Sequence, residues 1–513
     1  MAEAAALDVV CLGRAAVDLY GQQVGGRLED VQSFAKYLGG SSANLAVGLA
    51  RLGLRPAMLT RVGDEHLGRF VREQLAREGV DVSHVVTDPE RLTGLVVLGI
   101  AGADAYPHVF FRTLCADMGL VTDDFDEAWI SSARALAVTG THLSTSTTRR
   151  AVQQAMQWAR SHGRGVVLDI DYRPVLWGLT TAGAGDNRYV AAQAVTQVLQ
   201  EFLADCDVIV GTEEEVRIAG GSDDTDAALR SIRERSNAVI VLKRGAAGCV
   251  IHEPGVEPRA VAGFPVEPFN VLGAGDAFLS GLLAGWLEGA GWERCAELGN
   301  ACGALVVSRH GCSPAMPSRV ELEAYLARAS SLRRPARDEW IAHLHRATTT
   351  RRPRDELHVL AFDHRRQFET LAGQYGAPWT RISQFKDLVA RAVERVAERD
   401  GGARVGVIVD ERHGNAALER FTHRGTWVGR PIELPGSKPL RFEPLDEPGL
   451  ALRDWPAHHV VKCLAFYHPD DPGDLRRDQE ARLAALHADC VALDRELLLE
   501  LITTSSGRPN DDR

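Results

Sequence analysis

The sequence lacks the marks of a disulfide scaffold, a zinc protein or a membrane protein. Its nine cysteines are scattered, with no C-x-x-C pair and no Cys/His cluster at zinc spacing, which predicts reduced, mostly buried thiols. No run of about 18 uncharged apolar residues occurs. The N-terminus has neither the basic start nor the apolar core of a signal peptide. We therefore expect a cytoplasmic protein with no membrane partner.

Aromatic residues are few, and basic residues are fewer than acidic ones (58 Lys and Arg against 69 Asp and Glu). Aromatic content is 6% and the formal net charge is -11, which argues against a nucleic-acid partner. Hydrophobic content of 45% and charged content of 25% are typical of globular proteins, and 513 residues are too many for one ordinary core. The composition favours an enzyme of at least two domains that acts on a small molecule.

From residue 7 to about residue 328, short apolar β-type runs alternate with helical stretches. Near-continuous apolar strands separated by helices indicate a parallel sheet covered on both faces, with ligands at the carboxyl ends of its strands. Residues 17–38 and 91–112 break this rhythm and are predicted to form a small β lid over those strand ends. We expect residues 1–328 to form the first domain.

Residues 329–355 change character, because arginines crowd among prolines and threonines. This pattern predicts a solvated basic linker with some helix around Trp340 to His345. RNA binding is the alternative, although interleaved aromatics are missing. Residues 356–513 again alternate between about four strands and helices, which indicates a second α/β unit with a disordered tail from Thr503.

Two glycine-rich stretches carry the strongest chemical signal. Gly273-Ala274-Gly275-Asp276 places bare amides and a carboxylate on the first turn of a predicted helix, where a phosphate oxygen is favoured. A carboxylate there repels the phosphate unless it has a task, such as removing a proton from an attacking hydroxyl. A simple aspartate helix cap is the alternative. Earlier, Gly39-Gly40 precede a predicted helix in which Asn44 lies one turn in and can reach a ligand hydroxyl.

Together the two stretches resemble the signatures of the ribokinase-like (PfkB-type) carbohydrate kinases, over residues 7 to about 328. The resemblance implies an α/β fold with a Rossmann-type parallel sheet sandwich and a β lid. It also implies transfer of the ATP γ-phosphate to a sugar, with Mg²⁺ as cofactor. Asp276 would be the base, and the amides of Gly273, Ala274 and Gly275 the anion hole. No G-x-x-x-x-G-K-[ST] loop is needed, and none is present.

Other positions match the family one by one. Asp18 corresponds to the acceptor of the sugar hydroxyls, and Glu214 to the residue that organises magnesium through water. Departures occur as well: Asp171 replaces the usual Asn of D-x-N-x-R-P, and Asn270-Val271-Leu272 replaces the usual Asp-Thr, which weakens the expectation of a monovalent-cation site. The remaining expected contacts are Gly39, Gly40 and Asn44 for the sugar and Lys243, Gly245, Gly248 and Asn300 for the nucleotide.

The departures resemble a subgroup of the family that acts on an acidic keto-sugar of inositol catabolism. Arg14, Arg112 and Arg173 are available for the carboxylate of such a sugar acid, and Arg173 is the preferred candidate. Another keto-sugar acid, such as 2-keto-3-deoxygluconate, is an alternative, as is a nucleoside stacked on Tyr106 or Phe110. A catalytically silent sugar- or nucleotide-binding regulator is a third.

Residues 356–513 resemble an aldolase-like domain that is fused to some of these kinases. The similar segments are 358–365 and 459–471, and the resemblance places the Schiff-base lysine on a strand later than that of Lys462. About four strands make an incomplete (β/α) barrel, since a closed one has eight. We therefore expect no aldolase activity. Exposed lid edges could also pair two copies, which makes a homodimer a candidate assembly.

Overall fold

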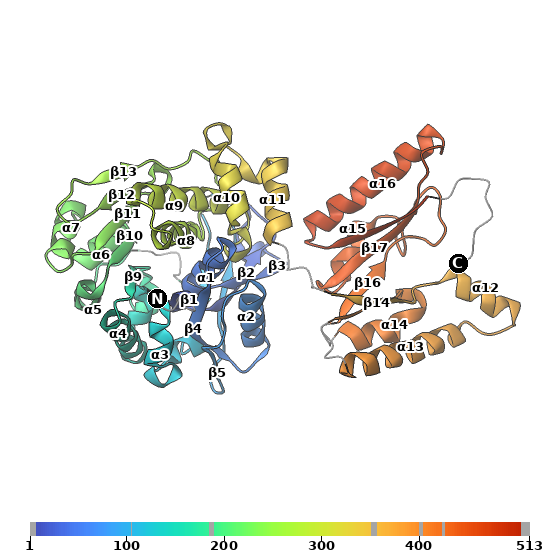
Figure 1. Cartoon of the computed structure of the whole chain (residues 1–513), viewed down its shortest axis with the longest axis horizontal. Helices are drawn as coiled ribbons and strands as arrows, with labels where there is room; N and C mark the ends of the chain where they lie inside the picture. Colours follow the sequence, from blue (N-terminus) through green and yellow to red (C-terminus); the bar gives the residue numbers. More distant parts are fainter. Residues whose placement is uncertain are drawn as a thin grey trace, which may run out of the picture. The chain divides into compact units, whose positions relative to one another are not determined.

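The computed structural model describes residues 7–103, 105–183, 189–349, 356–399, 404–422 and 426–503. The chain divides into two compact units, Met1–Arg352 and Pro353–Arg513 (Figure 1). The predicted disordered tail lies, from residue 504 onward, outside the described residues. In the described part, no helix has the length and apolar content needed to cross a bilayer.

A nine-stranded sheet forms the centre of the first unit, in the order β13-β12-β11-β10-β9-β8-β1-β4-β5. All neighbouring pairs are parallel except those of β12 and β13, which are antiparallel. This arrangement confirms the predicted parallel sheet. The strands are β1 (Leu7–Leu12), β4 (Pro56–Gly63), β5 (Val85–Asp88), β8 (Ala133–Thr139), β9 (Gly165–Asp169), β10 (Val208–Thr212), β11 (Val239–Lys243), β12 (Cys249–His252) and β13 (Arg259–Val261).

Helices cover both faces of this sheet, because successive strand residues point to opposite sides. Along β1, Val9 and Cys11 enter one core, whereas Val10 and Leu12 enter the other. The first core packs under α1 (Ser41–Arg51), α2 (His66–Arg77), α8 (Ala274–Leu287), α9 (Trp292–Val307) and α10 (Arg319–Leu326). The second packs under α3 (Glu127–Ser131), α4 (Ser146–Ser161), α5 (Gln193–Phe202), α6 (Glu213–Gly220) and α7 (Thr225–Arg233).

A separate four-stranded sheet forms the lid, in the order β3-β2-β6-β7. Its strands are β2 (Ala16–Gly21), β3 (Phe34–Gly39), β6 (Gly94–Leu98) and β7 (His108–Phe111). Strand β2 pairs antiparallel with β3 and parallel with β6. The lid therefore joins the two segments that interrupt the strand–helix rhythm, and it has a small core of its own around Tyr20 and Phe110.

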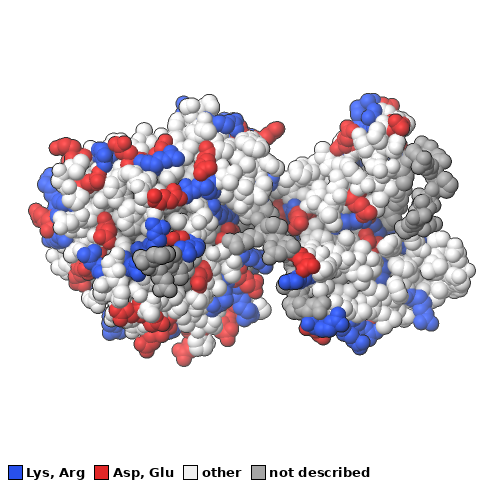
Figure 2. Space-filling model, in the orientation of Figure 1, with Lys and Arg blue, Asp and Glu red and all other residues white. Residues whose placement is uncertain are grey.

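The expected linker from 329 to 355 differs in the structure. Helix α11 (Glu339–Thr349) packs against α10, and its Ile341 is fully buried in the first core. Arginine crowding suggested a solvated segment, but the buried apolar residues of α11 lie on one face and hold it against the rest of the first unit. Figure 2 shows acidic and basic side chains interspersed over the visible face of this unit.

The second unit is a curled sheet of five parallel strands in sequential order, half of a barrel. The sequence predicted four of them; β16 was missed because glycine and arginine interrupt its apolar run. The strands are β14 (His358–Ala361), β15 (Val405–Ile408), β16 (Trp427–Pro431), β17 (His459–Phe466) and β18 (Leu497–Ile502). The helices are α12 (Arg366–Gln374), α13 (Thr380–Arg399), α14 (Glu411–Thr422), α15 (Pro448–Asp454) and α16 (Gly473–Ala492).

Candidate active site

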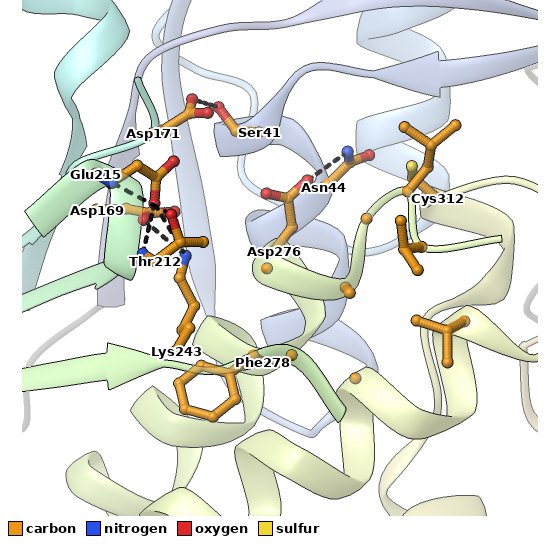
Figure 3. A pocket seen from close by; sticks show the side chains of 18 of the residues that line it. Ser41, Asn44, Asp169, Asp171, Thr212, Glu215, Lys243, Asp276, Phe278 and Cys312 are labelled. Atoms are coloured by element: carbon orange, nitrogen blue, oxygen red, sulfur yellow. Dashed lines mark hydrogen bonds and ion pairs between the residues drawn. The ribbon is translucent and has the colours of Figure 1, made fainter. Parts of the chain in front are cut away.

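A cavity of about 1040 Å³ opens between the lid and the carboxyl ends of the main strands. The two glycine-rich stretches, at the starts of α1 and α8, contribute to its wall together with the end of β11 (Figure 3). Every expected site residue lines the cavity except Gly39, which lies next to it. The structure thus brings together residues that are up to 286 positions apart, from Arg14 to Asn300.

Helix α8 presents its N-terminus to the cavity. Gly273 is the N-cap residue with φ of 76°, and a Cβ there would lie 2.8 Å from Sγ of Cys312, so only glycine fits. Ala274, Gly275 and Asp276 form the first turn and line the cavity. Their amides have no helical acceptors, which makes this turn suited to an anion. Burial, followed by repulsion from Asp171, raises the pKa of Asp276 to about 6.

Asn44 on α1 holds the carboxylate of Asp276. Its Nδ2 donates to Oδ2 of Asp276 at 2.8 Å, although the two residues are 232 positions apart (Figure 3). The two glycines before α1 admit the neighbouring strand β2. A Cβ on Gly39 would lie 2.1 Å from Asp18, and one on Gly40 would lie 2.5 Å from the carbonyl oxygen of Arg14. Both glycines therefore position sugar-side residues by close approach.

A charged cluster lies on the other side of the anion-binding turn. Nζ of Lys243 lies 3.2 Å from Oδ1 of Asp169 and 3.9 Å from Glu215. The same Nζ would be only 3.3 Å from a Cβ on Gly275, so the ammonium group adjoins the helix N-terminus. Burial by itself would lower the pKa of Lys243. The carboxylates of Asp169 and Glu215 together have the larger effect and raise this pKa above its usual value, so the lysine is protonated.

Two of the three arginines that line the cavity pair with Asp171. Nη2 of Arg14 donates to Oδ2 of Asp171 at 2.6 Å, and Nη2 of Arg173 lies 3.4 Å from Oδ1 of the same carboxylate. Burial would raise the pKa of Asp171, but these two guanidinium groups lower it to about 2. Arg112 pairs instead with the buried Asp117, while its Nε and Nη1 have no hydrogen-bond partner among the described residues.

The wall of the cavity near β12 and β13 is lined by glycines and apolar side chains. Gly248 has φ of 93°, and a Cβ there would collide with the carbonyl oxygen of Val261 at 2.1 Å. Asn300 was expected to contact nucleotide; in the structure its Nδ2 donates to the carbonyl oxygens of residues 261 and 262 at 3.2 and 3.1 Å, which braces this wall. Gly245 and the exposed Glu214 also line the cavity.

From the sequence alone, no role was assigned to four residues of the site. Asp169 ends β9, Glu215 lies in the first turn of α6, and Tyr20 and Cys312 meet at 2.8 Å on the lid side. One signal was available, since Thr212-x-x-Glu215 is a capping-box pattern, and the structure shows both of its hydrogen bonds. Glu215 is buried for that reason, whereas Glu214 faces the cavity. Asp169 is the first residue of the D-x-N-x-R-P segment, whereas the partner of Cys312 is distant in sequence and left no local pattern.

The lid, the parallel sheet and the glycine-bounded helix start define a class of enzyme, the ribokinase-like sugar kinases. The chain belongs to the pfkB family of carbohydrate kinases, whose family model matches residues 6–319. A second model, described as an uncharacterized protein conserved in bacteria (DUF2090), matches residues 321–513.

The similarity to known proteins extends over nearly the full length of each relative and over about 62–64% of this chain. The chain is 33% identical to a 5-dehydro-2-deoxygluconokinase of Geobacillus kaustophilus, over 62% of this chain and 93% of the relative. It is 30% identical to the protein of the same name from Bacillus subtilis, over 64% and 98%. A solved PfkB protein from Polaromonas sp. JS666 is 32% identical with a TM-score of 0.54, covering 62% of this chain and all of that one. A Vibrio cholerae fructokinase solved with fructose, ADP and calcium is 27% identical with a TM-score of 0.54, over 62% and 99%.

In the second unit, Lys462 lies on β17 among carboxylates. Its Nζ lies 3.3 Å from Asp363, 3.7 Å from Glu433 and 3.3 Å from Glu500. Burial lowers the pKa of Lys462, but the three carboxylates raise it above its usual value. A Schiff-base lysine must be neutral to attack a carbonyl, so this setting opposes that role.

Proposed function

We propose that the enzyme phosphorylates 5-dehydro-2-deoxy-D-gluconate at its terminal hydroxyl, with ATP as donor. The observation that carries the proposal is Asp276, a half-buried carboxylate in the first turn of α8, whose N-terminus lines the cavity. The names of the relatives support the choice of sugar. An acidic keto-sugar also fits a sugar end that contains three arginines.

In this proposal the residues divide the work by position. Asp276 accepts the proton of the sugar hydroxyl as that oxygen attacks the γ-phosphorus. The amides of residues 273–275 and the ammonium of Lys243 stabilise charge on the transferring phosphoryl group. Asp18 accepts a hydrogen bond from a hydroxyl of the sugar. The lid excludes water, which would otherwise compete as acceptor of the phosphoryl group.

Mg²⁺ fits this site through Glu214. Magnesium keeps several waters and binds one or two carboxylates together with substrate phosphates, so a single accessible carboxylate suffices. The described residues contain no group of three or more His, Cys, Asp or Glu side chains that could hold a metal by themselves. When bound, the metal neutralises charge on the phosphates. Glu215 is committed to Lys243, Arg173 and the cap of α6.

Arg112 is our candidate for the substrate carboxylate, in place of the initial preference for Arg173. Arg14 and Arg173 both pair with Asp171, whereas two nitrogens of Arg112 have no partner. A buried unpaired N–H costs about 1–3 kcal/mol, which a carboxylate from the ligand would recover. The guanidinium fork matches a carboxylate with two parallel hydrogen bonds.

Coupled measurement of ADP release tests the function. The panel holds 5-dehydro-2-deoxy-D-gluconate, 2-keto-3-deoxygluconate, fructose and a nucleoside, each with ATP and Mg²⁺. We expect the highest kcat/KM with the first sugar acid. A nucleoside preference would redirect the assignment to stacking on Phe110, which lines the cavity while Tyr106 does not. No turnover with any of them would favour the silent regulator.

Further parts of the proposal concern the whole chain. We place the kinase domain at residues 1–328 extended by α11, and the half-barrel from 356 onward. The half-barrel is proposed to be catalytically silent as an aldolase, because Lys462 is held protonated. We also propose a cytoplasmic location and a homodimer formed through lid edges, which sedimentation at several concentrations would test.

A further inference from the structure

The loop between α9 and α10 lies against the proposed base. It carries Ser313, whose buried hydroxyl lies 2.6 Å from Oδ1 of Asn44, the residue that binds Asp276. The same hydroxyl lies 2.8 Å from the carbonyl oxygen of Leu38, just before the two glycines of the sugar side. Ser313 therefore contacts both Asn44, which binds the carboxylate of Asp276, and the end of the strand that precedes α1.

The chemistry of these groups fixes the direction of each hydrogen bond. An ionised carboxylate only accepts, so the Asn44 amide must present its nitrogen to Asp276. Its oxygen then faces Ser313, whose single hydroxyl proton can go either to this oxygen at 2.6 Å or to the carbonyl oxygen of Leu38 at 2.8 Å, and the shorter distance favours Asn44. Without that donor, the amide could rotate by 180° and present its oxygen to the carboxylate, which would repel it.

Side chains from two other elements hold the Ser313 loop. Nη1 of Arg51, at the end of α1, donates to the carbonyl oxygen of Pro314 at 3.0 Å, and Nε2 of His345 lies 3.0 Å from the same oxygen. Nδ1 of His345 lies 2.8 Å from Oε2 of Glu321 on α10. His345 belongs to α11, which lies beyond residues 6–319, the range matched by the carbohydrate kinase model.

We propose that Ser313 is a positioning residue that orients the Asn44 amide toward Asp276, and that α11 supports it through the contact of His345 with Pro314. The inference rests on the proposed role of Asp276. It assigns a task in the kinase reaction to a helix that lies in the range of the DUF2090 match.

Steady-state kinetics of full-length Ser313→Ala and Ser313→Thr test the first step. We expect the alanine variant to lose about tenfold in kcat with KM for ATP unchanged, because misorientation of the base affects the transition state. Its kcat profile should also lose activity at a higher pH than the parent, since the Asn44 hydrogen bond lowers the pKa of Asp276. The threonine variant keeps the hydroxyl and should restore both values.

The second step is tested on α11 with a matched pair of variants. His345→Ala should lower kcat several-fold, whereas His343→Ala, on the exposed face of the same helix, should not. Thermal unfolding of each variant separates loss of fold from loss of orientation. A folded Ser313→Ala variant with the kcat and pH profile of the parent would overturn the positioning role of Ser313. A folded His345→Ala variant with the kcat of the parent would overturn the role of α11. A wild-type enzyme that turns over no sugar, or an active Asp276→Asn variant, would instead overturn the proposed function.

Discussion

Replacing Asp276 by Asn is the sharpest test of the chemistry, because it changes charge with almost no change in volume. The new amide can still accept from Nδ2 of Asn44, which lies 2.8 Å from the present carboxylate, so the fold should be retained. What is lost is the base. General-base catalysis contributes a factor of about 10² to 10⁴, or roughly 3 to 5.5 kcal/mol of the activation barrier.

We expect kcat for the sugar acid to fall by two to four orders of magnitude (roughly 10² to 10⁴) in the coupled ADP assay. ATP affinity, measured by calorimetry, should be unchanged or slightly higher, because a carboxylate near the phosphate site repels it. Asp64→Asn is the matched control, since that aspartate is exposed and lies outside the cavity. A variant of Asp276 that keeps kcat within tenfold of the parent would refute its role as base.

Four further predictions concern pH, specificity, packing and the second unit. Because burial raises the pKa of Asp276 to about 6 and the ionised form is the base, kcat should fall as pH drops through that value, to about one tenth at pH 5; a flat kcat from pH 7 to 5 would contradict this. Arg112→Gln should lower kcat/KM for the sugar acid about 10- to 100-fold more than for fructose, and an equal loss for both sugars would exclude a carboxylate contact. Gly275→Ala should displace the Lys243 ammonium and reduce kcat/KM for ATP about 10- to 100-fold, which a titration of initial rates against ATP would detect. Borohydride should trap no substrate on Lys462, as judged by intact mass, and a trapped adduct would restore the aldolase alternative.

Much of the site could be predicted because its signals are local. Gly273, Gly275 and Asp276 are close together in the sequence and predict a helix N-terminus. Apolar runs that alternate with helical stretches indicate a parallel sheet. The sequence indicated a helix around residues 340–345, but not that α11 packs onto the first unit, because arginines surround its apolar face. The bond between Ser313 and Asn44 was not predictable in this way, since it joins residues 269 positions apart.

The sequence by itself determined the class of fold, the family and the glycine-bounded helix turn that we propose binds a phosphate, because backbone amides and glycine conformations depend on neighbouring residues. Only the tertiary structure decided which charges pair. Asp171 forms ion pairs with Arg14 and Arg173, and Asp169 forms one with Lys243. Two nitrogens of Arg112 have no hydrogen-bond partner in the described part of the chain. Such choices depend on burial and on distances across the folded core, which spacing along the chain does not encode.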